Sequence, residues 1–330
     1  MKALVFDRPG NPGEVLQSRD MPLPEPGFRQ VRVRMLASPI NPSDLLTIQG
    51  GYAAAPQYPA IPGYEGVGVV EAAGGGLLPR LRKGKRVALI SQQGGTWAEN
   101  VIVSAKHVVP VPDSIPAEQA ATFFINPMTA LAMTRRVLKV PPEAWLLQTA
   151  AGSALGQMVI RLGKLHGFRT INVVRRPEQV EQLKRVGADE VICETTESVE
   201  ERVHAITQNN GVPFLLDPVG GKTGSAAVRC LAAGGKALLY GVLSGEPIEV
   251  DPRFMITGSK RVEGFWLADW LRGQGILSMV SMARQVRKLM QTGVIKSDFA
   301  GIYPLDEYQK AIQHVRSSAR GGKVLFKISG

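Results

Sequence analysis

The chain has 330 residues, of which 44% are hydrophobic and 20% charged, and its formal net charge is +11. This length suits two domains with cores of their own, and no apolar run reaches the roughly 20 residues of a membrane helix, so we expect no membrane partner. Two cysteines, Cys193 and Cys230, exclude a disulfide framework and a four-cysteine zinc lobe. A single disulfide is the alternative to the two buried thiols that we expect. The start of the chain carries no recognisable targeting segment, which predicts a cytoplasmic protein unless such a segment has been removed.

The first 125 residues are rich in proline and glycine and contain short alternating apolar segments. Strands are expected at residues 31–37, 66–72, 86–91 and 99–103. A basic run from Arg80 to Arg86 has no interleaved aromatic residue, so we expect no stacking of bases there. Its place between a glycine-rich turn and the apolar residues 87–90 predicts a solvated loop face. The pattern predicts an irregular β-barrel domain over residues 1–125.

From residue 126 onward, apolar strands alternate with amphipathic helices. The expected strands are residues 145–150, 169–174, 190–194, 214–217 and 236–240, and the expected helices are residues 155–167, 178–186, 199–208 and 222–232. Such alternation predicts a parallel, doubly wound sheet over residues 126–268, and therefore an α/β fold class. A tail, residues 269–330, is expected to return to the first domain with a helix at 276–292 and a strand at 322–328.

The loop from Ser38 to Tyr52 has a distinctive composition. Pro39 and Pro42 restrict its backbone, and two glycines permit a sharp turn directly before Tyr52. A phenol held there could donate a proton to a reacting carbon. An ordinary half-buried loop aromatic would fit the same pattern.

The loop after the first strand of the second domain resembles a dinucleotide fingerprint. Aligned on G-x-G-x-x-G, it has Ala151 and Ser153 at the first two glycine positions and Gly156 at the third. Small residues between a strand and a helix let the backbone approach a pyrophosphate at the helix N-terminus. A simple strand–helix turn would also need small residues.

The second strand of this domain ends in two arginines, Arg175 and Arg176, about 20 residues beyond the glycine loop. NAD-binding proteins carry an acid at this place, and an acid would repel a 2′-phosphate. Guanidinium groups can instead form paired hydrogen bonds with it. The sequence therefore predicts NADPH as the cofactor.

The order of barrel, nucleotide domain and tail resembles the medium-chain dehydrogenase/reductase superfamily. Zinc alcohol dehydrogenases of that superfamily carry Cys shortly before Ser/Thr-Asp, where this chain has Asn41 before Ser43–Asp44, and they carry G-H-E, where this chain has Gly63–Tyr64–Glu65. The third ligand is also missing, because residues 124–128 contain neither Cys nor His. Catalytic zinc needs three protein ligands, so we expect no metal.

Within the superfamily, residues 2–328 closely resemble the NADPH-dependent 2-enoyl thioester reductases of fatty-acid synthesis. The shared pieces are S-P-I-N-P-S-D, I-N-P-M-T-A, R-T-I-N-V-V-R-R-P, P-V-G-G-K, L-Y-G and G-F-W-L. The resemblance implies a GroES-like barrel as catalytic domain and a Rossmann domain for NADPH. It also implies hydride transfer to the β-carbon of a trans-2-enoyl thioester, of coenzyme A or of acyl carrier protein, and a proton to the α-carbon.

The resemblance also implies roles for particular residues. Tyr52 matches the proposed proton donor, and Tyr64, at a lost zinc-ligand position, is a rival donor. Relatives suggest a homodimer joined through sheet edges of the nucleotide domain, near residues 245–258. The residues implied in cofactor binding are Asn41, Asn126, Gly152, Ser153, Ala154, Leu155, Gly156, Arg175, Arg176, Tyr240, Gly241, Val242, Leu243, Phe265, Trp266, Leu267 and Lys323.

Two other functions fit the sequence. A quinone oxidoreductase would share the fold and NADPH, but it would reduce a quinone. A non-catalytic protein that binds RNA through its basic surface would leave the cofactor features without a use. Nucleic acid is therefore not an expected partner.

Overall fold

The computed structural model describes residues 1–51, 56–317 and 321–329. The chain forms two compact units: unit 1 consists of Met1–Asn126 and Val280–Gly330, and unit 2 of Pro127–Met279. The sequence placed the end of the nucleotide domain at residue 268, whereas unit 2 continues into the helix α12 (Ile276–Gln291).

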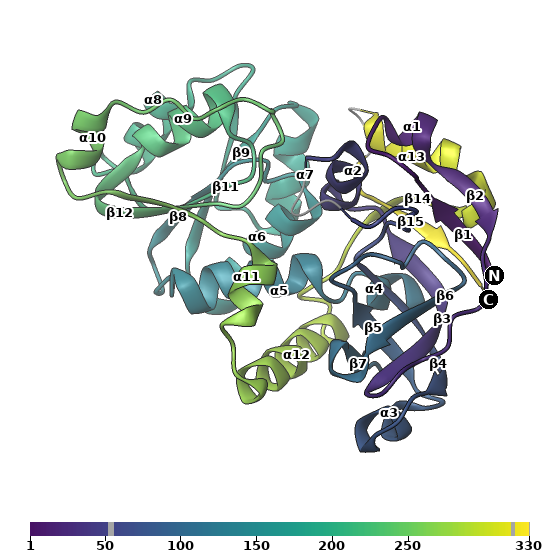
Figure 1. Cartoon of the computed structure of the whole chain (residues 1–330). Helices are drawn as coiled ribbons and strands as arrows, with labels where there is room; N and C mark the ends of the chain where they lie inside the picture. The colour runs from purple at the N-terminus through teal and green to yellow at the C-terminus, as the bar shows by residue number, and fades with distance from the viewer. Residues whose placement is uncertain (52–55, 318–320, 330) are drawn as a thin grey trace. The chain divides into compact units, whose positions relative to one another are not determined.

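Unit 1 is built around a mostly antiparallel sheet (Figure 1). The sheet order is β14-β15-β3-β4-β5-β7, and β6 pairs with β3. These strands are β3 (Gln30–Pro39), β4 (Glu65–Ala73), β5 (Arg86–Ile90), β6 (Asn100–Ser104), β7 (Val108–Pro110), β14 (Phe299–Pro304) and β15 (Lys323–Lys327). The last strand of the chain thus lies beside β3, with Leu325 opposite Pro39, so the C-terminal strand belongs to the same sheet as a strand from the first 40 residues.

Smaller elements surround this sheet. A separate antiparallel pair is formed by β1 (Lys2–Val5) and β2 (Gln17–Asp20). The helices are α1 (Pro12–Val15), α2 (Pro42–Gln49), α3 (Leu77–Arg82), α4 (Ala117–Ala121) and α13 (Tyr308–Arg316), with short 3-10 turns at Ala105–His107 and Leu305–Glu307. Val31, Val33 and Leu89 lie in one core cluster of the sheet, and Trp97 and Phe326 lie in another that includes α13.

Unit 2 has a six-stranded, fully parallel sheet in the order β10-β9-β8-β11-β12-β13. The strands are β8 (Trp145–Gln148), β9 (Arg169–Val174), β10 (Glu190–Cys193), β11 (Val212–Asp217), β12 (Leu231–Leu239) and β13 (Arg261–Gly264). The helices are α5 (Ile125–Leu131), a π-helical turn at Ala132–Val137, α6 (Ala154–His166), α7 (Glu178–Val186), α8 (Val199–Ile206), α9 (Gly221–Arg229), α10 (Pro252–Ile256) and α11 (Leu267–Arg272). The strand order reverses between β8 and β11, so the carboxyl ends of these strands form the ligand-binding edge of such folds.

The helix ends of unit 2 follow from local chemistry. The Ser153 side chain caps α6 by accepting from the backbone N–H of Gly156. Gly167 and Gly187 end α6 and α7 in the left-handed region, with φ of 78° and 104°. Both glycine stops confirm the sequence prediction, and so does the doubly wound parallel sheet.

Two local predictions were wrong. The helix predicted at residues 222–232 ends at Arg229, and Leu231 already belongs to β12, where it pairs with Val212. The basic run predicted as a solvated loop instead starts within the short helix α3. Both cysteines are buried free thiols, as expected.

Candidate functional site

The N-terminus of α2 carries the first half of a buried polar cluster in unit 1. Asn41 precedes the helix, and its backbone N–H donates to Asp44 Oδ2 at 2.7 Å. The other oxygen of Asp44 accepts from the backbone N–H of Tyr64 at 3.2 Å, which ties α2 to the entry of β4. Burial raises the pKa of Asp44 to about 7, while the two backbone donors and Lys323 oppose the rise and Glu65 adds to it.

Glu65, the first residue of β4, is the second buried carboxyl group of this cluster. Its Oε1 accepts from the Asn41 amide nitrogen at 3.0 Å, and its Oε2 accepts from the backbone N–H groups of Phe124 and Ile125 at 3.1 and 2.9 Å. Burial raises the pKa of Glu65, against the pull of the Lys323 charge and these hydrogen bonds. Glu65 therefore fixes the segment that leads directly to Asn126, which is half-buried.

Lys323, the first residue of β15, completes the cluster. Its Nζ donates to the amide oxygen of Asn41, and the residue is buried. An ammonium group can only donate, so the Asn41 oxygen must face Lys323 and its nitrogen must face Glu65. The structure thus brings Asn41, Lys323 and Asn126 to one region of unit 1. Sequence reasoning did not identify Asp44 and Glu65 as structural partners, although both occur in the motif it used.

Of the two tyrosines proposed as proton donors, the structure describes only one. Tyr52 lies outside the described residues; the helix before it ends at Gly50, which has φ of 80°. The Tyr64 hydroxyl lies 2.7 Å from Thr47 Oγ1, and the Thr47 hydroxyl donates to the carbonyl of Ser43. Because Thr47 has a single hydroxyl proton, Tyr64 must be the donor between the two side chains.

In unit 2, the glycine loop lies between the carboxyl end of β8 and the N-terminus of α6. A side chain at Gly156 would come within 2.5–2.8 Å of the Ala151 backbone, so the helix packs against its own loop there. A side chain at Gly152 would meet the Gln179 amide, which also accepts from the backbone N–H of Arg176 at 3.3 Å. Gln179 links the two predicted cofactor segments and was missed from the sequence. Ala154 is half-buried and Leu155 is buried.

The two arginines leave the carboxyl end of β9. Arg175 is exposed, and its guanidinium has no hydrogen bond or ion pair within residues 1–51, 56–317 and 321–329. Its backbone carbonyl accepts from Thr195 Oγ1 at 3.1 Å. Arg176 is half-buried and lies 3.4 Å from the Glu178 carboxylate. Arg175 is thus the free cation of the pair.

The remaining predicted cofactor residues follow β12 and β13. The backbone N–H of Tyr240 donates to the Asp217 carbonyl, and that of Leu243 to the Pro218 carbonyl. The buried Tyr240 hydroxyl has no hydrogen-bond partner in the part of the chain that the structure describes, and burial raises its pKa. Gly241, Val242, Leu243 and Trp266 are exposed, Phe265 is half-buried and Leu267 is buried.

Asp217, at the carboxyl end of β11, organises this edge of the sheet. It accepts from the hydroxyl of Thr149 and from the backbone N–H groups of Val219 and Gly220. The sequence did not single it out, because its contacts with Thr149 and with the loop after β11 arise only in the folded sheet. The carboxyl ends of β8, β9, β11, β12 and β13 therefore bring all the predicted cofactor segments of unit 2 to one edge.

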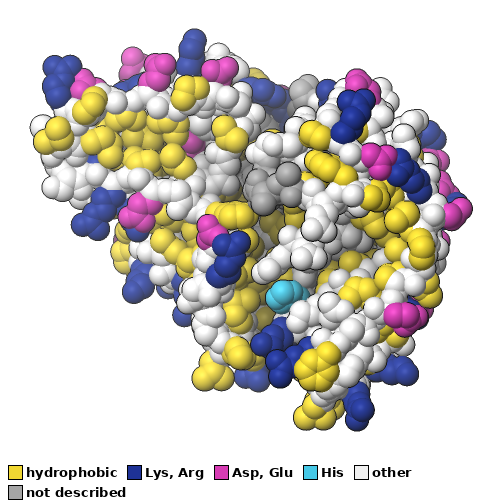
Figure 2. Space-filling model, in the orientation of Figure 1, with side chains coloured by type: hydrophobic (Ala, Val, Ile, Leu, Met, Phe, Trp, Pro, Cys, Tyr) yellow, Lys and Arg dark blue, Asp and Glu magenta, His cyan; other side chains and the backbone are white. Residues whose placement is uncertain are grey.

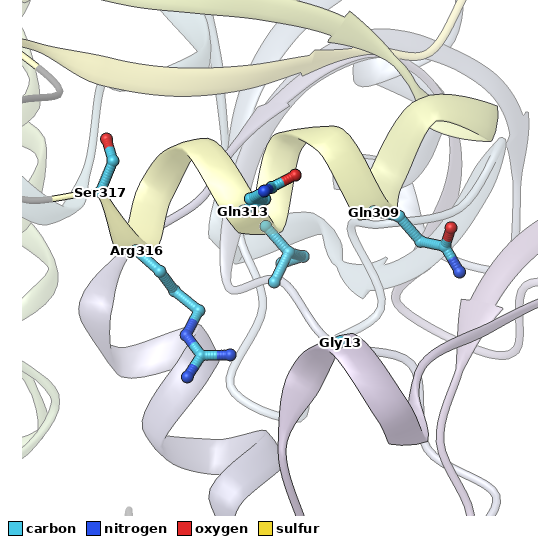
Figure 3. A pocket seen from close by; sticks show the side chains of 6 residues that line it. Gly13, Gln309, Gln313, Arg316 and Ser317 are labelled. Carbon is cyan, nitrogen blue, oxygen red and sulfur yellow. The ribbon is translucent and has the colours of Figure 1, made fainter.

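Two surface hollows lie away from these residues. One, of about 640 Å³, lies between α1 and α13, where Arg316 donates to the Asn11 side chain (Figure 3). The other, of about 310 Å³, includes Trp145 and Arg169 at the amino ends of β8 and β9, opposite the predicted cofactor edge. Among the residues that the structure describes, none predicted for the site lines either hollow.

The described residues contain neither a candidate membrane-spanning helix nor a candidate metal cluster. No helix among them is both long and apolar enough to cross a membrane. No group of three or more His, Cys, Asp or Glu side chains among them could hold a metal ion.

Family models that match this chain describe dehydrogenases, and a sequence relative is a reductase. The family model of the alcohol dehydrogenase GroES-like domain matches residues 27–113, and that of the zinc-binding dehydrogenase matches residues 154–282. The mitochondrial enoyl-acyl-carrier-protein reductase of Homo sapiens is 33% identical over 317 residues, which cover 95% of this chain and 85% of the relative.

Solved structures are similar over nearly the whole chain. A putative NADPH:quinone reductase from Bacillus thuringiensis is 34% identical, with a TM-score of 0.94 and 99% of both chains covered. Escherichia coli quinone oxidoreductase, solved with NADPH, is 26% identical, with a TM-score of 0.91 and 99% of this chain and 100% of that chain covered. The chain belongs to the zinc-independent medium-chain dehydrogenase/reductases, an oxidoreductase family that includes relatives of both kinds.

Proposed function

We propose that this oxidoreductase uses NADPH to reduce the C2=C3 double bond of trans-2-enoyl thioesters. The observation that carries the proposal is the exposed Arg175 beside Arg176, at the place where an NAD-binding fold carries an acid; its guanidinium has no partner in the described part of the chain. The substrate class is supported by the 33% identity to an enoyl-acyl-carrier-protein reductase over most of both chains.

The residues of unit 2 fit NADPH in three respects. The Ser153-capped N-terminus of the 13-residue helix α6 offers backbone N–H groups and a positive dipole end for the pyrophosphate. Arg175 offers a free guanidinium for the 2′-phosphate. The buried hydroxyl of Tyr240, at the carboxyl end of β12, is a polar group to which no described residue offers a hydrogen bond. When bound, NADPH supplies the hydride that the β-carbon of the substrate receives.

A zinc ion, which the description of the second family model implies, does not fit these residues. The positions that would supply Cys and His carry Asn41 and Tyr64, and the Tyr64 hydroxyl is already bonded to Thr47. The ammonium of Lys323 bonds to Asn41 and would repel a divalent cation there. We therefore derive no step that passes through a metal.

In unit 1, the role that we assign to the buried cluster is to hold Asn41 in one orientation. Lys323 donates a hydrogen bond to its amide oxygen, and its amide nitrogen donates one of its two hydrogens to Glu65. The second amide hydrogen has no partner among the described residues and is the donor that we assign to the cofactor ribose. Asn126, held next to the Glu65-bound backbone, would serve the nicotinamide side of NADPH.

Reduction leaves negative charge on the thioester oxygen and a carbanionic α-carbon that must be protonated. A tyrosine with an ordinary pKa of about 10 is a usable acid toward such a carbon. We assign this proton to Tyr52. Tyr64 is less suited, because its hydroxyl already donates to Thr47.

A direct assay tests the proposal. NADPH oxidation would be followed with crotonyl-CoA, a longer enoyl-CoA and a quinone under the same conditions. We expect kcat/KM for an enoyl thioester to exceed that for the quinone by at least about tenfold. Turnover of the quinone alone would replace this proposal with the second candidate, and turnover of neither would remove both.

That second candidate is an NADPH:quinone reductase. It is favoured by the structural match to the putative Bacillus thuringiensis enzyme, which at 34% identity is as similar in sequence as the enoyl reductase relatives. The fold and the cofactor residues would be the same, so only the substrate assay separates the two. The cytoplasmic location expected from the sequence stays a prediction, since the curated relative is mitochondrial.

We also propose that the protein is a homodimer joined through the edge of unit 2. The edge strand β13 pairs only with β12 in the described sheet, and the hydrophobic side chain of Ile256, on the helix α10 that precedes β13, is exposed. Figure 2 includes hydrophobic side chains gathered beside α10 on this unit. Light scattering on wild type and Ile256→Glu tests the proposal, which predicts a dimer that the substitution weakens; a monomeric wild type would reject it.

A further inference from the structure

Three large apolar side chains are exposed together at one end of unit 1. Phe28, Leu77 and Leu81 are 70%, 75% and 61% exposed. Phe28 precedes β3, and its ring lies against Gly75 and Gly76, the two residues before α3. We call Phe28, Leu77, Leu81 and the cations around them the α3 tip.

The apolar residues of α3 point in two directions. Leu78 packs against the core of the barrel sheet and Pro79 is buried, so this face anchors the helix. Leu77 and Leu81 are four residues apart and therefore share the opposite, exposed face. The exposed leucines are thus displayed by a helix that is itself firmly attached to the sheet.

The tip is surrounded by unpaired positive charge. Arg29, Arg80, Lys83 and Lys85 are exposed, and none has an ion-pair partner among the described residues. No acidic residue occurs between Glu71 and Glu99 in the sequence. The acids closest in the chain, Glu25 and Glu71, are paired with Arg32 and Arg34. In Figure 2, hydrophobic side chains bordered by Lys and Arg occur at the α3 end of unit 1.

We propose that the α3 tip binds the surface of an anionic lipid membrane. Leucine and phenylalanine side chains enter the boundary between headgroups and acyl chains, while lysine and arginine attract anionic lipids. The net charge of +11 adds long-range attraction to such a surface. The sequence led us to expect no membrane partner because no segment could span a bilayer, but a peripheral contact needs no spanning segment.

Other polyanions fit the tip less well. A nucleic acid would meet the cations but leave Leu77 and Leu81 in water. An acyl carrier protein would need to dock near the residues that we assign to catalysis, and the tip lies at the far end of β4 from Glu65. The strand β4 has nine residues, from Glu65 to Ala73. At about 3.3 Å per residue its two ends are roughly 26 Å apart, and Ala73 pairs with Val31 near the start of β3.

The test is flotation of the full chain with vesicles of phosphatidylcholine alone or mixed with phosphatidylglycerol, at low and high salt. We expect binding to the anionic vesicles only, weakened by salt. Leu77→Ser with Leu81→Ser is expected to weaken binding by at least about tenfold. Lys83→Glu with Lys85→Glu is expected to do the same through charge.

Matched controls separate the tip from general effects. Ile276→Ser with Leu277→Ser removes two residues that are as exposed, at 72% and 86%, from the start of α12. Arg136→Glu with Lys139→Glu makes the same change in net charge at exposed sites of unit 2. Both controls are expected to bind vesicles nearly as wild type does, and all four variants are expected to keep NADPH-dependent turnover, which verifies folding.

Three results would overturn the proposal. One is absence of binding to anionic vesicles by a wild type that turns over NADPH. Another is an equal loss of binding in tip and control variants. The third is retention on immobilised acyl carrier protein or RNA, lost in the tip variants, without any vesicle binding; the tip would then be a docking site for that polymer.

Discussion

The ammonium of Lys323 donates a hydrogen bond to the amide oxygen of Asn41, although the two residues are 282 positions apart in the chain. The contact exists because β15 pairs with the end of β3, directly before α2. A residue from the tail thereby sets the orientation of a side chain from the first domain. The polar cluster is therefore complete only when the tail strand β15 is paired with β3.

The first prediction concerns this contact. Lys323→Met should lower the free energy of unfolding by about 2 to 4 kcal/mol, because it leaves the Asn41 oxygen and the buried Glu65 carboxyl without their cationic neighbour. Urea unfolding followed by tryptophan fluorescence measures the change. Lys327→Met, on the same strand but exposed, should change stability by less than about 0.5 kcal/mol; equal losses in the two variants would contradict the assignment.

The second prediction concerns pH. Burial raises the pKa of Asp44 to about 7, above the value of about 3.9 in an unfolded chain. Between these values the folded state holds more protons than the unfolded state, so this group makes stability fall as pH rises, by at most about 1.4 kcal/mol per pH unit. The contribution is fully present below about pH 4 and lost above about pH 7.

Asp44→Asn removes the titrating group and isolates its effect. In the variant, an NH2 group replaces one of the two Asp44 oxygens that accept hydrogen bonds, so the variant should be less stable than wild type at every pH. The difference in stability between wild type and variant should nevertheless be larger near pH 5 than near pH 8, because only wild type is stabilised by protonation of Asp44. Urea midpoints at both pH values measure this, and a difference between the two proteins that is independent of pH would reject the raised pKa.

The third prediction tests the cofactor assignment. Arg175→Ala should raise the Kd for NADPH by about 10- to 100-fold and leave NADH nearly unchanged, because only NADPH carries the 2′-phosphate. Fluorescence titration with both dinucleotides measures it. Arg185→Ala, an exposed arginine on α7, is the matched control. Equal weakening of NADPH and NADH by Arg175→Ala would show that the guanidinium does not recognise the phosphate.

The fourth prediction separates the two tyrosines. Tyr52→Phe should lower kcat by about 10²- to 10⁴-fold with little change in NADPH binding, if this phenol protonates the α-carbon. Tyr64→Phe should lower kcat by less than tenfold and stability by about 1 kcal/mol, because it mainly removes the hydrogen bond to Thr47. Single-turnover rates of both variants test this prediction. A larger loss of rate in Tyr64→Phe than in Tyr52→Phe would make Tyr64 the donor.

Local patterns in the sequence predicted the second unit well. The strand β9 and the helix α7 lie exactly where their residues predicted them, and Gly167 and Gly187 end helices as expected. Leu231 was assigned to a helix because the alanines around it favour helix. Its pairing with Val212 in the parallel sheet is a tertiary contact that local propensity does not contain.

The polar cluster of unit 1 could be predicted only in part. Asn41 and Glu65 were noticed as motif positions, and Lys323 as a cofactor contact that the resemblance implied. Their hydrogen bonds, however, join β15, β4 and the start of α2. Such contacts depend on strand order, which composition does not fix. Similarly, the run Arg80–Arg86 was expected to be a solvated loop because of its place between a glycine-rich turn and a strand. Its first residues instead belong to α3, which Leu78 and Pro79 anchor to the sheet.

The fifth prediction concerns the close packing of the glycine loop. Alanine normally stabilises a helix relative to glycine by about 1 kcal/mol, but a Cβ at Gly156 would come within 2.5–2.8 Å of the Ala151 backbone. Because backbone atoms cannot yield as a side chain can, Gly156→Ala should lower the free energy of unfolding by about 1 to 3 kcal/mol and weaken NADPH binding. Gly275→Ala, where a Cβ meets nothing within 4 Å, should do neither. A Gly156→Ala protein that is more stable than wild type and binds NADPH equally well would show that the turn before α6 can accommodate a Cβ at this position.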